Sequence, residues 1–185
     1  MKKTIIASVV GGILIFAWSF LSWPVLNLHK AANKYTPNNA AIMENLKANL
    51  SEEGGYMLPG LPETALKEDH EKMMKEGNGK PWASIQYHNA AESTEKDMMM
   101  NMIRALLVNI VMIMLFCWIL GKMNMAGFGT IFMSSLYMGL IIFLGSSYSN
   151  NIWYKWFDIM AYFTDALISW ALVGLWLGWY LGKKR

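Results

Sequence analysis

The stretch IMAYFTDALISWALVGLWLGWYL, residues 159–181, decides the fold class of this 185-residue chain. Asp165 is its one charged residue, and about 20 predominantly apolar residues are enough to cross a bilayer core as a helix. Similar runs occupy residues 4–28, 98–120 and 128–147. Hydrophobic residues make up 55% of the chain and charged residues 16%, against roughly 45–50% and 25% in soluble proteins. The sequence therefore predicts an all-α membrane protein, a bundle of four transmembrane helices.

The first of these runs follows Lys2 and Lys3, as the apolar region of a signal peptide would. Such a region spans about 7–15 residues and ends at a cleavage site flanked by small residues. Residues 4–28 are longer, and no such site follows them closely. We therefore expect an uncleaved membrane anchor.

The placement of basic residues predicts the orientation of the four spans. The two termini and the turn at 121–127 together carry six lysines and arginines and no acidic residue. Residues 29–97, which would lie on the other side, carry eight lysines and eleven acidic residues. Because basic residues concentrate in cytoplasmic loops, both termini should be cytoplasmic in a bacterial inner membrane. The loop at 29–97 should then be extracytoplasmic, in the periplasm.

This loop is expected to fold as a small α-rich cap. Apolar residues recur every four positions at Ile42, Leu46 and Leu50, which predicts a helix over 37–50. A second helix is expected over 62–76, ended by Gly77, and an alternating extended segment over 80–88.

The fourth span carries glycines four residues apart, at Gly174, Gly178 and Gly182. Small residues at this spacing allow another helix to approach closely. The stripe is interpreted first as packing within the chain's own bundle, and alternatively as a docking face for another subunit.

Ionisable residues within spans are candidates for function by default. Asp158 and Asp165 are seven residues apart, so they share a helix face. Asn109 of the second span is a candidate partner for Asp165. An ion or proton relay and a structural hydrogen bond between helices both remain open. If His29 and Tyr56 converge on Asp165 at the outer surface, they would form a small site there.

Metal binding, cofactors and catalysis find less support in the sequence. The chain has 16 methionines, with clusters at 73–74 and 98–102, and thioethers suit Cu(I). The three histidines show no ligand spacing, and none lies within a span where it could hold haem. Cys117 sits in an apolar run. No catalytic residues, resident metal, cofactor or nucleic-acid partner are predicted.

Three motifs carry a resemblance: SWPVLNLH at 22–29, GYMLP at 55–59 and DALISWALVG at 165–174. Together they resemble an uncharacterised family of small four-span bacterial inner-membrane proteins. The family has a proline where this chain has Asn27. The resemblance implies the four-span fold and a bacterial envelope setting, and it implies no reaction.

The leading hypothesis for function is a non-enzymatic accessory or assembly subunit of a larger membrane complex or homo-oligomer. It would bind through the glycine stripe and the cap, with the lipid bilayer as its constant partner. The alternative is a small transporter or ion-coupled protein using Asp165, and an extracytoplasmic copper-handling protein is a more distant one.

Overall fold

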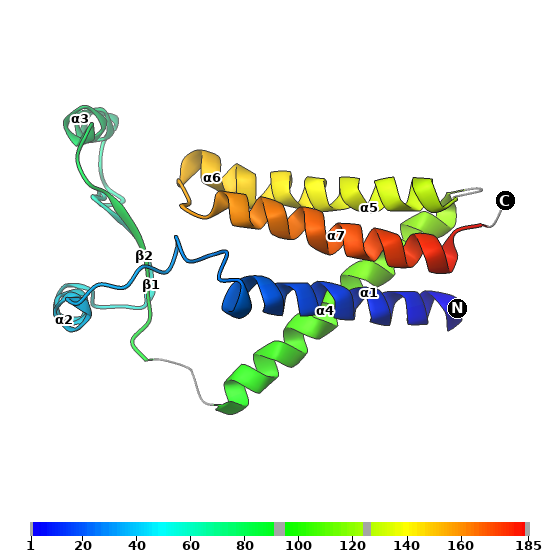
Figure 1. Cartoon of the computed structure of the whole chain (residues 1–185). Helices are drawn as coiled ribbons and strands as arrows, with labels where there is room; N and C mark the ends of the chain where they lie inside the picture. Colours follow the sequence, from blue (N-terminus) through cyan, green and yellow to red (C-terminus); the bar gives the residue numbers. More distant parts are fainter. Residues whose placement is uncertain (1, 91–94, 124–126, 184–185) are drawn as a thin grey trace. The chain divides into compact units, whose positions relative to one another are not determined.

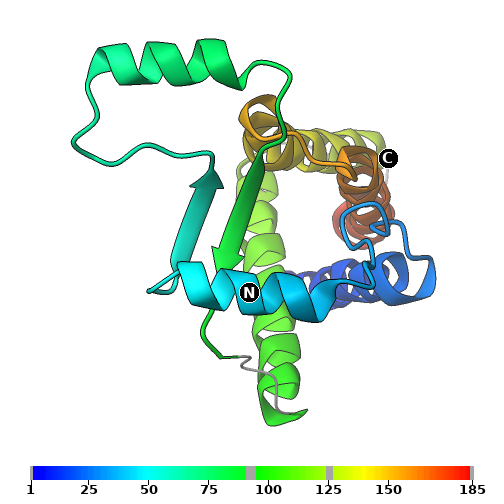
Figure 2. The ribbon, with the colours of Figure 1, turned by 90° about the vertical axis from the view of Figure 1, so that its left-hand side faces the viewer.

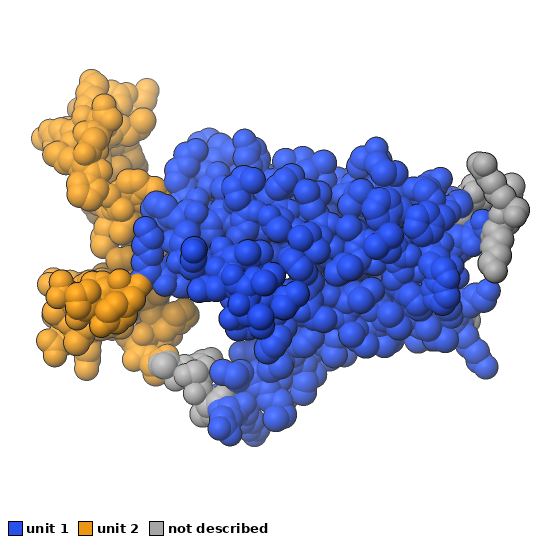
Figure 3. Space-filling view, in the orientation of Figure 1, with its two compact units in different colours: residues 1–34, 94–185 blue, residues 35–93 orange. Residues whose placement is uncertain are grey.

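In the computed structural model, residues 2–90, 95–123 and 127–183 are described. The chain divides into two compact units, residues 1–34 with 94–185 and residues 35–93 (Figure 3). Four helices are long and apolar enough to cross a membrane, and all four belong to the first unit. A helical bundle with the composition of a multi-pass membrane protein is therefore confirmed.

The helices of the bundle begin with α1 (Lys2–Phe20), which continues into the π-helical turn η1 (Leu21–Val25). After unit 2 come α4 (Glu95–Lys122) and α5 (Phe128–Ile142). The latter continues through η2 (Phe143–Tyr148) into α6 (Ser149–Trp153), so the third apolar segment ends later than residue 147. The last helix is α7 (Ile159–Leu181).

Small residues set the helix pairs of the bundle. Helix α4 crosses α1, which also packs along α7, and α7 packs along α5 (Figures 1 and 2). A Cβ built on Gly12 of α1 would lie 2.8 Å from the backbone of Ile110 in α4. A Cβ on Gly139 of α5 would lie 2.7 Å from the Ala166 carbonyl oxygen of α7. These approaches are closer than any side chain allows, so both pairs depend on the glycines.

The glycine stripe of α7 faces α5 of the same chain. A Cβ on Gly174 would meet Phe132 and Ser135 at 3.0 Å, and one on Gly178 would meet Phe128 at 2.8 Å. Gly182, just past the helix, approaches the backbone of Phe128. The stripe is thus covered within the chain, as the first of its two interpretations expects.

The core of the bundle joins all four helices. Its fully buried residues include Ala7 of α1, Ile113 of α4 and Val173 and Leu177 of α7. Phe116 of α4 meets Trp170 of α7 edge to face, with ring centroids 5.3 Å apart. The interior between these helices is therefore mainly apolar, and the buried serines Ser8 and Ser135 donate to carbonyl oxygens of their own helices.

Unit 2 has two short helices, α2 (Asn39–Asn49) and α3 (Lys67–Gly77). The second begins five residues later than the sequence predicts, because the Asp69 carboxylate accepts a hydrogen bond from the Leu66 N–H at 2.9 Å and caps the helix there. Neither helix has a buried residue.

Unit 2 also contains a two-stranded antiparallel sheet. Strand β1 (Gly54–Leu58) pairs with β2 (Ala83–Tyr87), and Tyr56 lies opposite Ile85. The alternating segment at 80–88 contains β2. Its partner β1 lies outside the elements that the sequence predicts, because local pattern does not show which strands pair. An α-rich description of this unit is therefore incomplete.

Candidate functional site

Three ionisable side chains meet where the end of α1 approaches the start of α7. His29 Nδ1 lies 2.7 Å from Asp158 Oδ2, and His29 Nε2 lies 3.0 Å from Asp165 Oδ2. We call His29, Asp158 and Asp165 the His29 cluster. The spacing of seven residues places both carboxylates on the face of α7 that receives the histidine.

The chain reverses after η1 and so brings His29 back over the end of the helix. Pro24 lies within η1, and Asn27 adopts φ 49°, a left-handed conformation that asparagine tolerates better than most residues. The Leu28 N–H then donates to the Ser22 carbonyl oxygen at 3.0 Å. This tight turn fixes the direction in which His29 leaves the backbone.

Asp165 has two further partners on the first span. The indole N–H of Trp18 donates to Asp165 Oδ1 at 3.0 Å, and the Ser22 hydroxyl donates to the same oxygen at 2.6 Å. The two donors are four residues apart, on one face of the helix. Asp165 therefore joins the first span to the last through three hydrogen bonds.

Asp158 occupies the N-cap position of α7, where an aspartate usually accepts hydrogen bonds from the first N–H groups of the helix. Its side chain makes no such bond here. It points instead to His29, and its side chain is only 3% exposed. The position of Asp158 in the sequence suits a helix cap, but its carboxylate bonds to His29 instead of capping α7.

Aromatic rings enclose the histidine. The Trp23 ring stacks on His29 at a centroid distance of 3.9 Å, and Tyr162 meets it edge-on at 4.7 Å. Trp156 packs in turn against Tyr162. His29 is 1% exposed, while the Asp165 side chain is 21% exposed. The cluster is therefore buried, with its one opening at Asp165.

The cluster must hold protons. Each of the two nitrogen–oxygen contacts of His29 needs one proton to be a hydrogen bond rather than a repulsion between lone pairs. Two protons suffice either as an imidazolium between two carboxylates or as a neutral imidazole beside one carboxylic acid. Both arrangements have a net charge of −1, and they differ by a short proton movement. The geometry therefore supports proton binding and exchange.

The other two residues singled out in the sequence are not among the partners described for the His29 cluster. Asn109, on α4, is half-buried and is not among the hydrogen-bond partners of Asp165 described above. Tyr56 belongs to unit 2, where its hydroxyl donates to the Glu52 carbonyl oxygen at 2.8 Å. His29, Asp158 and Asp165 are the candidates that the structure brings together.

Sequence reasoning missed the residues that complete the site. These residues are Trp18, Ser22, Trp23 and Tyr162. The spacing of Trp18 and Ser22 places two donors on one helix face, but serines of this helix also bond carbonyl oxygens of their own helix, as Ser8 and Ser19 do, so the spacing does not identify Asp165 as the acceptor. The stacking of Trp23 on His29 depends on the turn at Asn27 and had no signal in the sequence.

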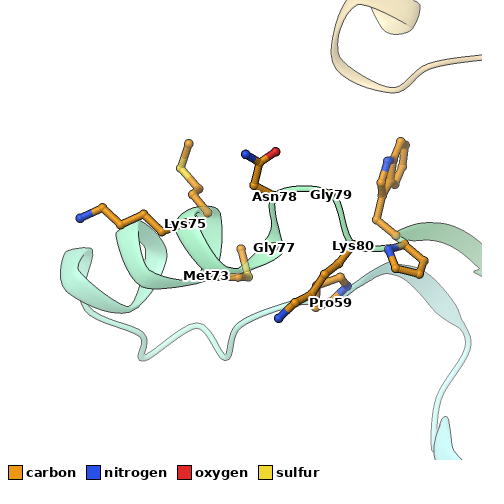
Figure 4. A pocket seen from close by; sticks show the side chains of 10 residues that line it. Pro59, Met73, Lys75, Gly77, Asn78, Gly79 and Lys80 are labelled. Carbon is orange, nitrogen blue, oxygen red and sulfur yellow. The ribbon is translucent and has the colours of Figure 1, made fainter.

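Unit 2 has an open groove of about 880 Å³ between α3 and the start of β2 (Figure 4). Met73 and Met74, two methionines of the copper hypothesis, line it together with Trp82 and Lys80. No histidine lines this groove. Among the described residues, no group of three or more His, Cys, Asp or Glu side chains is arranged to hold a metal ion.

Comparison with known proteins adds no name to this geometry. No family model, no curated protein and no solved structure matches the chain.

Proposed function

We propose that this chain is an ion-coupled protein of a bacterial inner membrane, in which the His29 cluster binds and releases protons. Both termini would be cytoplasmic and unit 2 extracytoplasmic, as the distribution of basic residues favours. The cluster would then face the periplasmic side, because it lies at the end of the bundle opposite the termini. The observation that carries the proposal is the placement of both imidazole nitrogens against carboxylates.

The position of the cluster supports coupling to a movement of helices. Close glycine contacts join α1 to α4 and α5 to α7, so the bundle contains two closely packed pairs. The His29 cluster lies across the seam between α1 and α7. Loss of a proton would place lone pairs against each other in a buried site, which costs free energy until the seam opens. Proton release and separation of the two pairs are thereby linked.

The test follows the protonation of His29 directly. His70→Gln and His88→Gln leave His29 as the only histidine, and ¹⁵N-labelled histidine in bilayer discs then reports both ring nitrogens by NMR. We expect the protonation pattern to change between pH 4 and pH 10 in the folded protein. Asp165→Asn should move that change to a different pH, while Glu44→Gln, an exposed carboxyl in unit 2, should not. If the protonation pattern stayed constant over the whole pH range, the cluster would be a purely structural contact between α1 and α7, and the proposal would be overturned.

A second candidate is the accessory or assembly subunit, which the surface of unit 2 favours. Tyr35 is 83% exposed, Met74 74% and Trp82 50%, so unit 2 has large apolar side chains that a partner could cover. A photo-crosslinker in place of Trp82 would test this role in native membranes. A reproducible adduct of one mass, absent with the crosslinker at Lys67, is expected. A chain that stays monomeric and uncrosslinked would exclude it.

A further inference from the structure

The end of the bundle that holds both termini carries lysines from three helices. Lys2 and Lys3 begin α1, Lys122 ends α4 and Lys183 follows α7, and all four are exposed. Figure 1 shows these ends together. The sequence has no aspartate or glutamate before residue 44, between 98 and 157, or after 165. This end of the bundle is therefore positive and has no acidic residue to offset it.

The helix register places the lysines at the same end of the bundle. Gly12 faces Ile110 and Gly11 faces Ile113, so α1 and α4 run antiparallel where they cross. The start of α1, with Lys2 and Lys3, and the last turn of α4, with Lys122, therefore lie toward one end of the bundle.

The last span reaches the same place. The Trp176 indole N–H donates to the Ala7 carbonyl oxygen at 3.1 Å, which aligns the final turns of α7 with the first turns of α1. Lys183 therefore lies at the same end as Lys2 and Lys3.

Exposed aromatic rings lie next to these charges. The Lys122 ammonium sits 5.1 Å from the centroid of the Trp118 ring, which is 64% exposed. On α7, Trp179 is 72% exposed. Indole rings at the headgroup level of a bilayer contact acyl chains with their apolar faces. The surface thus combines cations for a phosphate with rings for a hydrocarbon chain.

We propose that this surface, the basic rim of Lys2, Lys3, Lys122 and Trp118, binds the headgroup of an anionic phospholipid. The lysines hold the phosphate, and Trp118 packs on the first methylenes of the acyl chain. Basic clusters at the ends of membrane helices recognise such headgroups through charge. The exposed rings favour a lipid over a free phosphate ion, which would use the lysines alone. This inference is independent of the function proposed for the His29 cluster.

The test is a binding titration of the full chain in a neutral detergent with fluorescent phosphatidylglycerol and with fluorescent phosphatidylcholine. We expect tighter binding of phosphatidylglycerol, weakened by added salt. The triple variant Lys2→Gln/Lys3→Gln/Lys122→Gln should lose about 100-fold in affinity, at roughly fivefold for each lysine. Replacing the same three lysines by arginine should preserve binding.

The matched control removes the same charge from unit 2. Lys67→Gln/Lys72→Gln/Lys75→Gln changes three exposed lysines of α3, two of which pair with glutamates of that helix, and should leave the affinity unchanged. The proposal would be overturned if the chain bound both lipids with equal affinity. It would also be overturned if the two glutamine variants lost affinity equally, or if the arginine variant failed to bind. Displacement of the lipid by millimolar inorganic phosphate would overturn it too, because it would mean a free-ion site.

Discussion

Replacing His29 by phenylalanine tests the energetics of the cluster most directly. His29→Phe keeps a ring to stack on Trp23 and to meet Tyr162, so it removes the two nitrogen–carboxylate contacts with little change in packing. Asp158, with a side chain 3% exposed, then loses the one hydrogen bond described for its carboxylate. Asp165 retains its two donors from the first span.

The expected loss of stability follows from this difference between the two carboxylates. Removing one partner of a buried ion pair costs about 3–5 kcal/mol, because the other charge is left uncompensated. Asp158 should carry most of that cost, since Asp165 is still hydrogen-bonded and 21% exposed. We therefore expect His29→Phe to lower the free energy of unfolding by about 3–5 kcal/mol.

A compensating variant separates this explanation from general damage. His29→Phe with Asp158→Leu and Asp165→Asn removes all three ionisable side chains, and the side-chain oxygen introduced at 165 can still accept the hydrogen bonds of Trp18 and Ser22. Replacing a buried ionic group by apolar residues of similar size is often neutral or stabilising. The triple variant should therefore regain at least half of the loss.

The assay is unfolding of the purified chain in mild detergent by titration with dodecyl sulfate, followed by far-ultraviolet circular dichroism. The slope of the transition must stay constant for the midpoints to compare stabilities. If the free energy of unfolding of His29→Phe lay within about 0.5 kcal/mol of that of the parent chain, the reasoning would be refuted. It would also be refuted by a triple variant that is no more stable than the single one.

Three other substitutions and one ligand test probe the same structure. Asn27→Pro should destabilise the turn before His29 because proline cannot adopt φ 49°, whereas Asn27→Gly should not. Both variants are measured in the unfolding assay, and equal stabilities of the two would contradict the role given to the turn. Gly12→Ala should lower the free energy of unfolding by about 1–3 kcal/mol, since the added Cβ would meet the backbone of α4. Gly129→Ala, with open space around it, should not lower it. Trp18→Phe should lower the free energy of unfolding by about 0.6–1.7 kcal/mol, the range measured for hydrogen bonds between membrane helices. Trp179→Phe is the exposed control, and a similar loss in both variants would count against the bond from Trp18 to Asp165. Purified protein loaded with Cu(I) and desalted should retain no copper by elemental analysis, and stoichiometric retention would support the copper-handling alternative.

The four-helix architecture could be predicted because it depends on local properties of the sequence. Length and apolar composition define a helix that can span a bilayer, whatever it packs against. The glycine stripe of α7 also predicted a close helix contact. The identity of the partner, α5, could not be predicted, because small residues at this spacing fit any helix that can come near.

The site was predictable only in part. The spacing of Asp158 and Asp165 placed both on one helix face, and His29 and Tyr56 were named as residues that would form a site if they converged on Asp165; the contact of His29 with Asp165 is observed. What the sequence could not show is that α1 lies against this face of α7. Trp18 and Ser22 become donors to Asp165 only through that tertiary contact, as do the two bonds of His29.

Under the proposed function, the apolar core would restrict how a proton at the cluster moves. The core contains fully buried side chains such as Ala7, Val173 and Leu177, with the buried hydroxyl of Ser8 beside them. The proposed exchange would therefore use the exposed side of Asp165, whose side chain is 21% exposed. Transport across the membrane would then require the pairs α1–α4 and α5–α7 to separate along the seam that the cluster holds closed.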